Sequence, residues 1–247
     1  MPRILTYNVH GCIGTDRRLD VGRIVDAIAA FEPDIVALQE LDVGRARSGG
    51  VDQAHEIARG LDMACHFNAA LRVEEEQYGD AILTSYPERL VKAGPLPGLI
   101  GRMQVESRGA LWVAVDIAGV EVQIITAHLG LMPREQRRQA VALAGSDWLD
   151  CEDCRNPAIL LGDFNATGAS IVYRTLAAKM IDARRRAPSS AGTSTFPSTF
   201  PMLRIDHVFV TPDVRVKAIR APFRPLTRIA SDHLPLVMDF ELTPRAG

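Results

Sequence analysis

The stretch AILLGDFNA, residues 158–166, is an apolar run that ends in a carboxylate and an amide two positions apart. The run 159–161 predicts a short strand buried on both faces, as in the interior of a mixed or parallel sheet. Since successive strand side chains alternate, Asp163 and Asn165 would share one face if the extended geometry persists. Ligands tend to bind at such strand ends in α/β sheets. The alternative is an Asx-type turn that caps the following helix.

The same junction of an apolar strand with polar groups recurs along the chain. The other junctions are ILTYNVHG with Asn8 and His10, IVALQE with Glu40, VQIITAHLG with His128, RIDHVFV with Asp206 and His207, and ASDHLPLVM with Asp232 and His233. Six junctions suggest that strand ends converge on one rim, where so many charges would tolerate each other only around a cation and an anionic substrate. Asp206 and His233 could pair across adjacent strands, with the carboxylate fixing the tautomer of a histidine that acts as general base. The alternative is that these side chains are ordinary polar groups of the core whose hydrogen bonds are satisfied there.

The candidate metal ligands are oxygen donors, so Mg²⁺, or Mn²⁺ in its place, fits better than zinc. Cys151 and Cys154 have zinc-like spacing, but no second pair completes a tetrahedral set. The N-terminus lacks the layout of a signal peptide, and no apolar stretch approaches the roughly 18 to 20 residues of a membrane span. We therefore expect a reducing, cytoplasmic setting and no transmembrane segment.

The composition, 47% hydrophobic and 23% charged over 247 residues, is that of an ordinary globular protein, and we expect one domain over residues 1–247. A net charge of −2 gives no global attraction for polyanions, whereas dedicated nucleic-acid binders are more often basic.

Strands and helices are expected to alternate along the chain, which favours a layered α/β sandwich over an all-β barrel or a helical bundle. The pattern predicts strands at 3–9, 34–38, 81–85, 110–117, 120–127, 158–162, 205–210, 214–219 and 234–242. It predicts helices at 20–31, 51–60, 133–149 and 169–179. The Ser-, Thr- and Pro-rich stretch 188–201 is either a disordered connector or an ordered loop in which two Phe side chains pack.

Six short motifs resemble, in order and spacing, the metal-dependent endonuclease/exonuclease/phosphatase superfamily with the DNase I-like fold. They are TYN at 6–8, QE at 39–40, HL at 128–129, GDFN at 162–165, Asp206 and SDH at 231–233. The resemblance covers about residues 3–242. It implies a four-layer α/β sandwich, in which two mixed β-sheets pack face to face with helices on the outside. It also implies hydrolysis of a phosphate ester by metal-assisted attack of water.

The resemblance implies roles for individual residues. Glu40 would be the main Mg²⁺ ligand, with Asn8 lining the same site and Asp232 near it. His233, held by Asp206, would act as general base or as charge partner of the phosphate. Asp163 would orient or deprotonate the water, or protonate the leaving group. Asn165 and His128 would donate hydrogen bonds to phosphate oxygens, and Arg108 would contact the substrate unless it is a surface charge on an edge strand.

Two positions depart from the pattern of the superfamily. His10 stands where the abasic-site nuclease branch carries a carboxylate, which weakens assignment to that branch. Asp80 stands where relatives often have Asn, and we expect it near the site rather than in it.

The short chain and near-neutral charge lean away from a processive nucleic-acid enzyme. The N-terminal half and the stretch TFP…RIDHVFV resemble small bacterial members grouped with sphingomyelinase-type relatives. That resemblance implies a phosphodiester of a lipid headgroup or a small molecule as substrate, and no obligate protein partner is expected. An endonuclease or exonuclease acting on DNA or RNA is the alternative on the same fold. A catalytically inactive interaction module is the alternative of another class.

Overall fold

The computed structural model describes residues 1–98, 106–155, 157–188 and 190–243, and two β-sheets packed face to face form its centre. The first sheet has, in spatial order, β10 (Ser190–Ala191), β12 (Val214–Arg220), β13 (Leu236–Leu242), β1 (Arg3–Asn8), β2 (Ile35–Val43), β4 (Glu76–Thr84) and β3 (Ala64–Val73). The second has β5 (Glu88–Pro95), β6 (Gly109–Ile117), β7 (Val120–Ala127), β8 (Ala158–Asp163), β11 (Asp206–Val210) and β9 (Ile181–Asp182). Both sheets are mixed.

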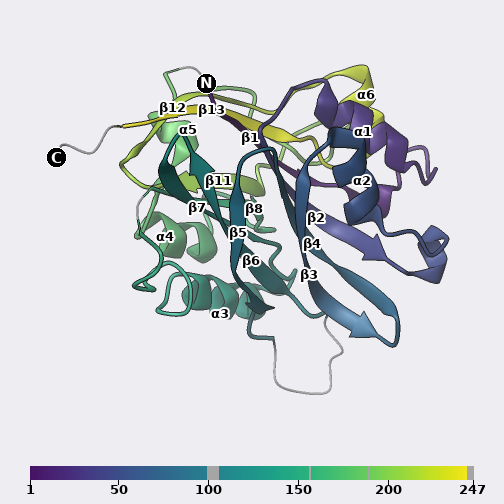
Figure 1. Cartoon of the computed structure of the whole chain (residues 1–247), viewed down its shortest axis with the longest axis horizontal. Coiled ribbons are helices and arrows are strands. Elements are labelled where there is room, and N and C mark those ends of the chain that lie inside the picture. Colours follow the sequence, from purple (N-terminus) through teal and green to yellow (C-terminus); the bar gives the residue numbers. More distant parts are fainter. Residues whose placement is uncertain (99–105, 156, 189, 244–247) are drawn as a thin grey trace.

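Six helices lie around the two sheets in the described residues. They are α1 (Val21–Ala29), α2 (Gln53–Leu61), α3 (Pro133–Leu143), α4 (Ile171–Ala177), α5 (Ala183–Arg186) and α6 (Pro225–Ala230), with 3₁₀ turns η1 (His10–Cys12) and η2 (Ala46–Ser48). The helices α1 and α2 pack on the first sheet, and α3 and α4 pack on the second (Figure 1). The four-layer α/β sandwich predicted from the sequence is therefore confirmed.

Alternation along the strands explains the layers. In β8, Ile159 and Leu161 enter the apolar layer between the sheets, whereas Leu160 faces the layer under α3 and α4. In β1, Ile4 faces the inter-sheet layer and Leu5 faces the layer under α1 and α2. Strands of this kind are buried on both faces, so their sequences are continuous apolar runs.

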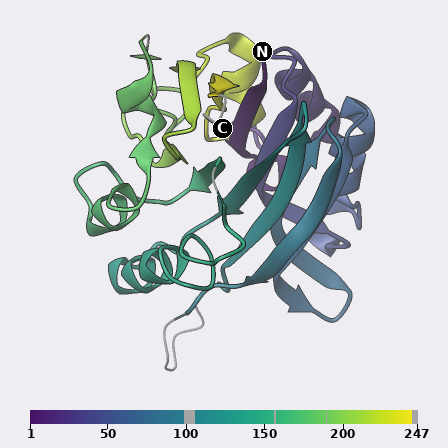
Figure 2. The ribbon, with the colours of Figure 1, turned by 60° about the vertical axis from the view of Figure 1, so that its left-hand side comes forward.

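Strand direction brings several chain segments to one edge of the sandwich. The first and last strands of the chain, β1 and β13, lie side by side in the first sheet (Figure 2). They are antiparallel, so the amino end of β13 meets the carboxyl end of β1, with Thr6 opposite Leu236. In the second sheet β11 runs antiparallel to β8, which places Asp206 opposite Asp163.

All four helices predicted from the sequence end at residues other than those expected, and two of them, α1 at Ala29 and α4 at Ala177, end two residues early. The helix predicted over 133–149 ends at Leu143, and turns follow it. The helix predicted to stop at Gly60 continues to Leu61, and Asp62 forms its left-handed cap with φ 55°. Gly60 has a packing role instead, because a Cβ there would lie 2.9 Å from the Val25 side chain of α1.

The sequence pattern missed the strands β3 and β5, which are edge strands of the two sheets. Their residues are mostly half-buried or exposed, so they lack the apolar run that reveals an interior strand. It also missed the short elements β9, β10, α5 and α6.

The part of the 188–201 stretch that the structure describes is ordered: the short strand β10 is followed by an ordered loop. The Phe196 ring lies 5.0 Å from the ring of His233, whereas Phe200 is exposed. One of the two Phe side chains therefore packs, and the connector interpretation is wrong. Among the described residues, none of the helices has the length and apolar character needed to cross a membrane.

Candidate active site

A cavity of about 600 Å³ opens at the edge where the strand ends converge. Its polar lining comes from both sheets and includes His10, Glu40, Arg108, His128, Asp163, Asn165, Asp232 and His233. A larger cavity of about 720 Å³ lies around the β6–β7 turn and Thr243, away from these histidines. The chemistry is therefore concentrated in the smaller cavity.

Asn8 links the two sheets at this edge. Its buried Nδ2 donates to Glu40 Oε1 at 2.8 Å and to Asp163 Oδ2 at 3.0 Å. Its Oδ1 accepts the backbone N–H of His10 at 3.0 Å. One amide thus holds two carboxylates from different sheets side by side.

Glu40 reaches the cavity because β2 is irregular at this point. The pairing of β2 with β4 shifts register between Leu38 and Leu41, and Glu40 has a left-handed φ of 62°. A bulge of this kind re-aims a side chain within a strand. Burial alone would raise the pKa of Glu40, but its interactions with His10, His128 and Asn8 outweigh burial and hold the pKa well below its ordinary value.

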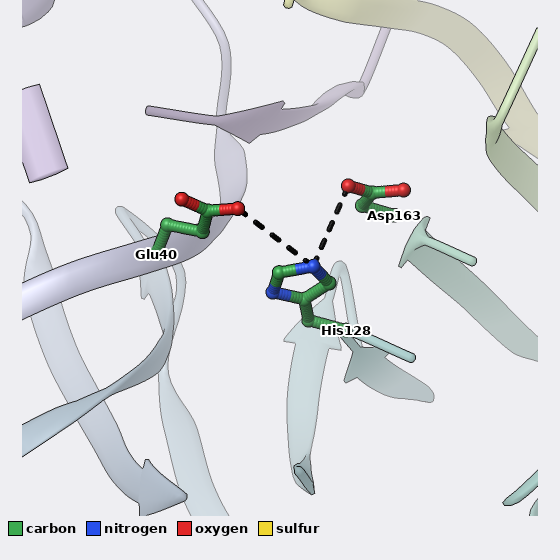
Figure 3. Close-up of side chains that lie close together, drawn as sticks. All are labelled: Glu40, His128 and Asp163. Carbon is green, nitrogen blue, oxygen red and sulfur yellow. Dashed lines mark ion pairs between the residues drawn. The ribbon is translucent and has the colours of Figure 1, made fainter. Parts of the chain in front are cut away.

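His128 lies between the carboxylates of Glu40 and Asp163 (Figure 3). Arg108 Nη1 is 2.8 Å from its Nδ1, and a guanidinium can only donate, so Nδ1 is the acceptor and Nε2 carries the proton. That Nε2 lies 3.5 Å from Asp163 Oδ2 and 3.8 Å from Glu40 Oε1. Burial, followed by Arg108, lowers the pKa of His128 to about 3, so the ring is neutral.

Arg108 itself is buried, which rules out a surface charge on an edge strand. It directly precedes β6, an interior strand of the second sheet, and its Nη2 also pairs with Glu106 Oε2 at 3.0 Å. The side chain lines the cavity and supports His128.

The backbone turns sharply after Asp163. The N–H of Asn165 donates to Asp163 Oδ1 at 2.8 Å, and Asn165 has a left-handed φ of 48°. The Asx-type turn is therefore present, and both side chains reach the cavity through this turn rather than through extended geometry. Asn165 Nδ2 donates to Leu129 O at 2.9 Å and lies 3.1 Å from His128 Nε2. Two N–H groups that lie this close together can both donate to one anionic oxygen beside them.

Asp206 and His233 form a buried pair. His233 Nδ1 donates to Asp206 Oδ2 at 2.9 Å, and the Thr195 hydroxyl donates to the same oxygen. Asp206 belongs to the second sheet and His233 precedes β13 of the first, so the expected pairing across adjacent strands is instead a contact between sheets.

The His233 pair faces Asp163, at 3.7 Å between His233 Nε2 and Asp163 Oδ2. Burial alone would lower the pKa of His233, but the charge and hydrogen bond of Asp206 outweigh it and raise the pKa to about 10. Burial, followed by the charge of Asp206, raises the pKa of Asp163 to about 7.

Asp232 lies at the outer side of the site. Its Oδ1 accepts the Ser231 hydroxyl at 3.3 Å, and its Oδ2 lies 3.8 Å from His10 Nδ1. His10 Nδ1 is also 3.5 Å from Glu40 Oε2. The structure thus gathers around one edge the nine side chains to which the resemblance gave roles, together with His10. His207 does not join them: it is buried outside the cavity lining, with its Nε2 2.7 Å from the carbonyl oxygen of Ala166.

The donor set fits a divalent cation. Glu40 and Asp163 place carboxylate oxygens next to the same amide, an arrangement of negative charge that a hard cation stabilises. His128 lies within 4.8 Å of both carboxylates but directs an N–H toward them, so it is a hydrogen-bond donor rather than a ligand. Asp206 and His233 are committed to each other.

Sequence analysis missed several supporting residues. Thr195 and Phe196 lie in a Ser- and Thr-rich stretch, in which only the two Phe residues indicated that the segment could pack against the rest of the protein. Gln136 of α3 donates to the carbonyl of Asn165 at 2.8 Å, but a helical Gln carries no signal of such a contact. Asp80, which the sequence analysis expected near the site rather than in it, is buried next to Glu40 and outside the cavity lining, and burial raises its pKa to about 8.

Comparison with known proteins agrees with this geometry. A model of the Endonuclease/Exonuclease/phosphatase family matches residues 5–233. Uncharacterized protein YbhP of Escherichia coli K12 is 26% identical over 259 residues, which cover 97% of this chain and 96% of YbhP. A mannosyl-6-phosphatase of Bacteroides thetaiotaomicron has a TM-score of 0.80 at 20% identity, over 98% of this chain and 100% of that chain. An endonuclease/exonuclease/phosphatase of Bacteroides vulgatus has a TM-score of 0.78 at 24% identity, over 98% of each chain. The protein belongs to the Endonuclease/Exonuclease/phosphatase family.

Proposed function

We propose that this protein is a divalent-cation-dependent phosphoesterase that hydrolyses a phosphodiester of a lipid headgroup or small molecule, with Mg²⁺ or Mn²⁺ as its cofactor. The observation that carries the proposal is the meeting of carboxylates, N–H donors and a charged His–Asp pair in one cavity. Carboxylates alone would repel a phosphate, and N–H donors alone would only bind it. Their combination suits binding of both a cation and a phosphoester.

The cation would be held by Glu40, with Asn8 beside it and Asp232 on its outer side. When bound, it would supply positive charge to a phosphate oxygen and so favour attack at phosphorus. His128 Nε2–H and Asn165 Nδ2–H would donate to phosphate oxygens, because the two nitrogens lie 3.1 Å apart and both residues line the cavity. Arg108 keeps His128 in the donating tautomer.

Asp163 is our candidate for the group that orients the attacking water and accepts its proton. Its pKa of about 7 is close to the pH at which a general base works best. His233, protonated below pH of about 10, would then be the charge partner of the phosphate. As water bonds to phosphorus, the bond from phosphorus to the leaving oxygen breaks.

The rest of the cavity favours a compact substrate with an apolar part. The remaining lining includes the apolar side chains of Ile13, Leu131, Phe196, Leu203 and Ile205, together with Arg47, Tyr78 and Glu106. A volume of about 600 Å³ is in the range of small-molecule sites. The name of the mannosyl-6-phosphatase with the same fold is in keeping with a small phosphoester.

The test is turnover of bis-p-nitrophenyl phosphate by chelator-treated protein before and after Mg²⁺ or Mn²⁺ is restored. We expect activity only with the cation, and a loss of about 100-fold or more in Asp163→Asn. Asp150→Asn is the matched control, because Asp150 is an exposed carboxylate paired with Lys179.

The same assay compares the p-nitrophenyl monoester, phospholipid vesicles, plasmid DNA and RNA. Faster cleavage of DNA or RNA would replace the proposal with a nuclease. Absence of turnover on every substrate would favour an inactive interaction module.

A further inference from the structure

His10 is held at the mouth of the cavity in an unusual conformation. Its φ is 50°, and its backbone N–H donates to Asn8 Oδ1 at 3.0 Å. A non-glycine residue in the left-handed region is uncommon and is often found at functional sites. The side chain is half exposed and lines the cavity.

The imidazole of His10 faces two carboxylate oxygens that have few other partners. Its Nδ1 lies 3.5 Å from Glu40 Oε2 and 3.8 Å from Asp232 Oδ2. Glu40 uses its other oxygen, Oε1, to accept from Asn8, and Asp232 uses Oδ1 to accept from Ser231. One nitrogen therefore lies within 4 Å of an oxygen of each of the two carboxylates.

These separations are long for ion-pair hydrogen bonds, which are about 2.7–2.9 Å between heavy atoms. They are close to the spacing of neighbouring ligands around one cation, which is about 3.0–3.6 Å for bonds of about 2.1 Å. A cation between the three groups would also offset the repulsion between the two carboxylates.

We propose that His10 supplies an imidazole nitrogen to the cation held by Glu40 and Asp232, and that this nitrogen makes the site select Mn²⁺ over Mg²⁺. Imidazole suits first-row transition ions, whereas Mg²⁺ prefers oxygen ligands throughout. The inference rests on the proposed function, since it concerns the cation of the same centre. It goes beyond that function by assigning the ligand that sets the metal preference.

The test measures Mn²⁺ binding without any phosphoester present. Pulsed electron paramagnetic resonance of one equivalent of Mn²⁺ on the chelator-treated protein should show coupling to an imidazole ¹⁴N. That coupling should be lost in His10→Asn and kept in His55→Asn, since His55 is an exposed histidine that pairs with Asp52. Asn and Asp tolerate left-handed backbone, and the thermal unfolding midpoint checks that the variants fold.

A second readout is the Mg²⁺ concentration that displaces half of the Mn²⁺. His10→Asp replaces the nitrogen with an oxygen donor, so the preference for Mn²⁺ should fall about tenfold or more. Imidazole coupling that persists in His10→Asn, or an unchanged preference in His10→Asp, would overturn the assignment.

The two proposals can fail separately. Mn²⁺ bound through His10 without hydrolysis of any phosphoester would reject the proposed function and keep this inference. Cation-dependent hydrolysis by a protein whose bound Mn²⁺ shows no coupling to a His10 nitrogen would support the proposed function and reject this inference.

Discussion

Three residues of the site share the left-handed backbone conformation, which residues other than glycine rarely adopt. The φ angles of His10, Glu40 and Asn165 are 50°, 62° and 48°. Each such conformation costs on the order of 1–3 kcal/mol, and the surrounding contacts must offset that cost. Asn8 Oδ1 and Asp163 Oδ1 supply two of these contacts by accepting the backbone N–H groups of His10 and Asn165.

The pairing of Asp206 with His233 gives a prediction about pH. Burial would lower the pKa of His233, but Asp206 raises it to about 10, so the imidazolium persists up to that pH. In Asp206→Asn the pKa should fall to its ordinary value of about 6.5 or below. If the charged ring is needed, kcat/KM of the variant should fall as the pH rises through about 6.5, whereas that of the wild type falls only near pH 10.

The measurement is kcat/KM against pH for both proteins with saturating cation. The acidic limb, set by Asp163, should lie at or below its pKa of about 7, because a bound cation favours the ionised carboxylate. An alkaline limb that does not move in Asp206→Asn would contradict the role given to His233.

At the scale of elements, interior strands were predicted well and edge strands poorly. The strands β1, β7 and β8 are apolar runs because both faces are buried, so their sequences identify them. The edge strands β3 and β5 expose much of their surface, and no local pattern distinguishes them from loops. The length of β2 was underestimated because its bulge at Glu40 interrupts the pattern.

Gly162 sets how closely β8 approaches β7. Its φ is 144°, and a Cβ there would lie 2.1 Å from the carbonyl oxygen of Ala127. Since the added Cβ and the Ala127 carbonyl oxygen would both lie in the interior of one sheet, neither could move away without disturbing β7 or β8. We expect Gly162→Ala to lower the free energy of unfolding by about 2 kcal/mol or more.

Urea unfolding followed by circular dichroism measures this change. Gly94→Ala in β5 is the matched control, because a Cβ at Gly94 would meet no atom within 4 Å. It should alter stability by less than about 1 kcal/mol. Equal effects of the two substitutions would show that the close approach at Gly162 is unimportant.

At the scale of the molecule, the site exists because two sheets share one apolar layer. That layer contains Ile4 and Ile82 from the first sheet and Leu161 and Val208 from the second. It fixes the distance between the ends of β1 and β8, and hence the contact of Asn8 with Asp163. This shared layer supports our proposal that residues 1–247 form one domain.

The substitution Leu161→Ala tests whether the sheets unfold together. The side chain is completely buried, so the cavity left behind should cost about 2–5 kcal/mol. We expect a single transition in wild type and variant, with tryptophan fluorescence and far-ultraviolet circular dichroism giving the same midpoint. Trp112, in β6, and Trp148 both lie in the apolar layer on the outer face of the second sheet, so their fluorescence reports on that sheet. Separate midpoints would indicate sheets that unfold independently.

The sequence located the strand-end residues of the site but not the contacts that organise them. Asn8, Glu40, His128 and Asp163 follow apolar runs, which makes them visible in the sequence. The hydroxyl of Thr195 on Asp206 and the support of His128 by Arg108 depend on how distant segments pack. Local pattern carries no information about such contacts.

The most direct test of the central claim is a crystal structure with Mn²⁺ and inorganic phosphate, with anomalous scattering recorded at the manganese edge. The account predicts a manganese peak within about 2.5 Å of a Glu40 carboxylate oxygen. It also predicts a phosphate oxygen within about 3.2 Å of both His128 Nε2 and Asn165 Nδ2. Manganese bound away from Glu40, or phosphate absent from this cavity at saturating concentration, would contradict it.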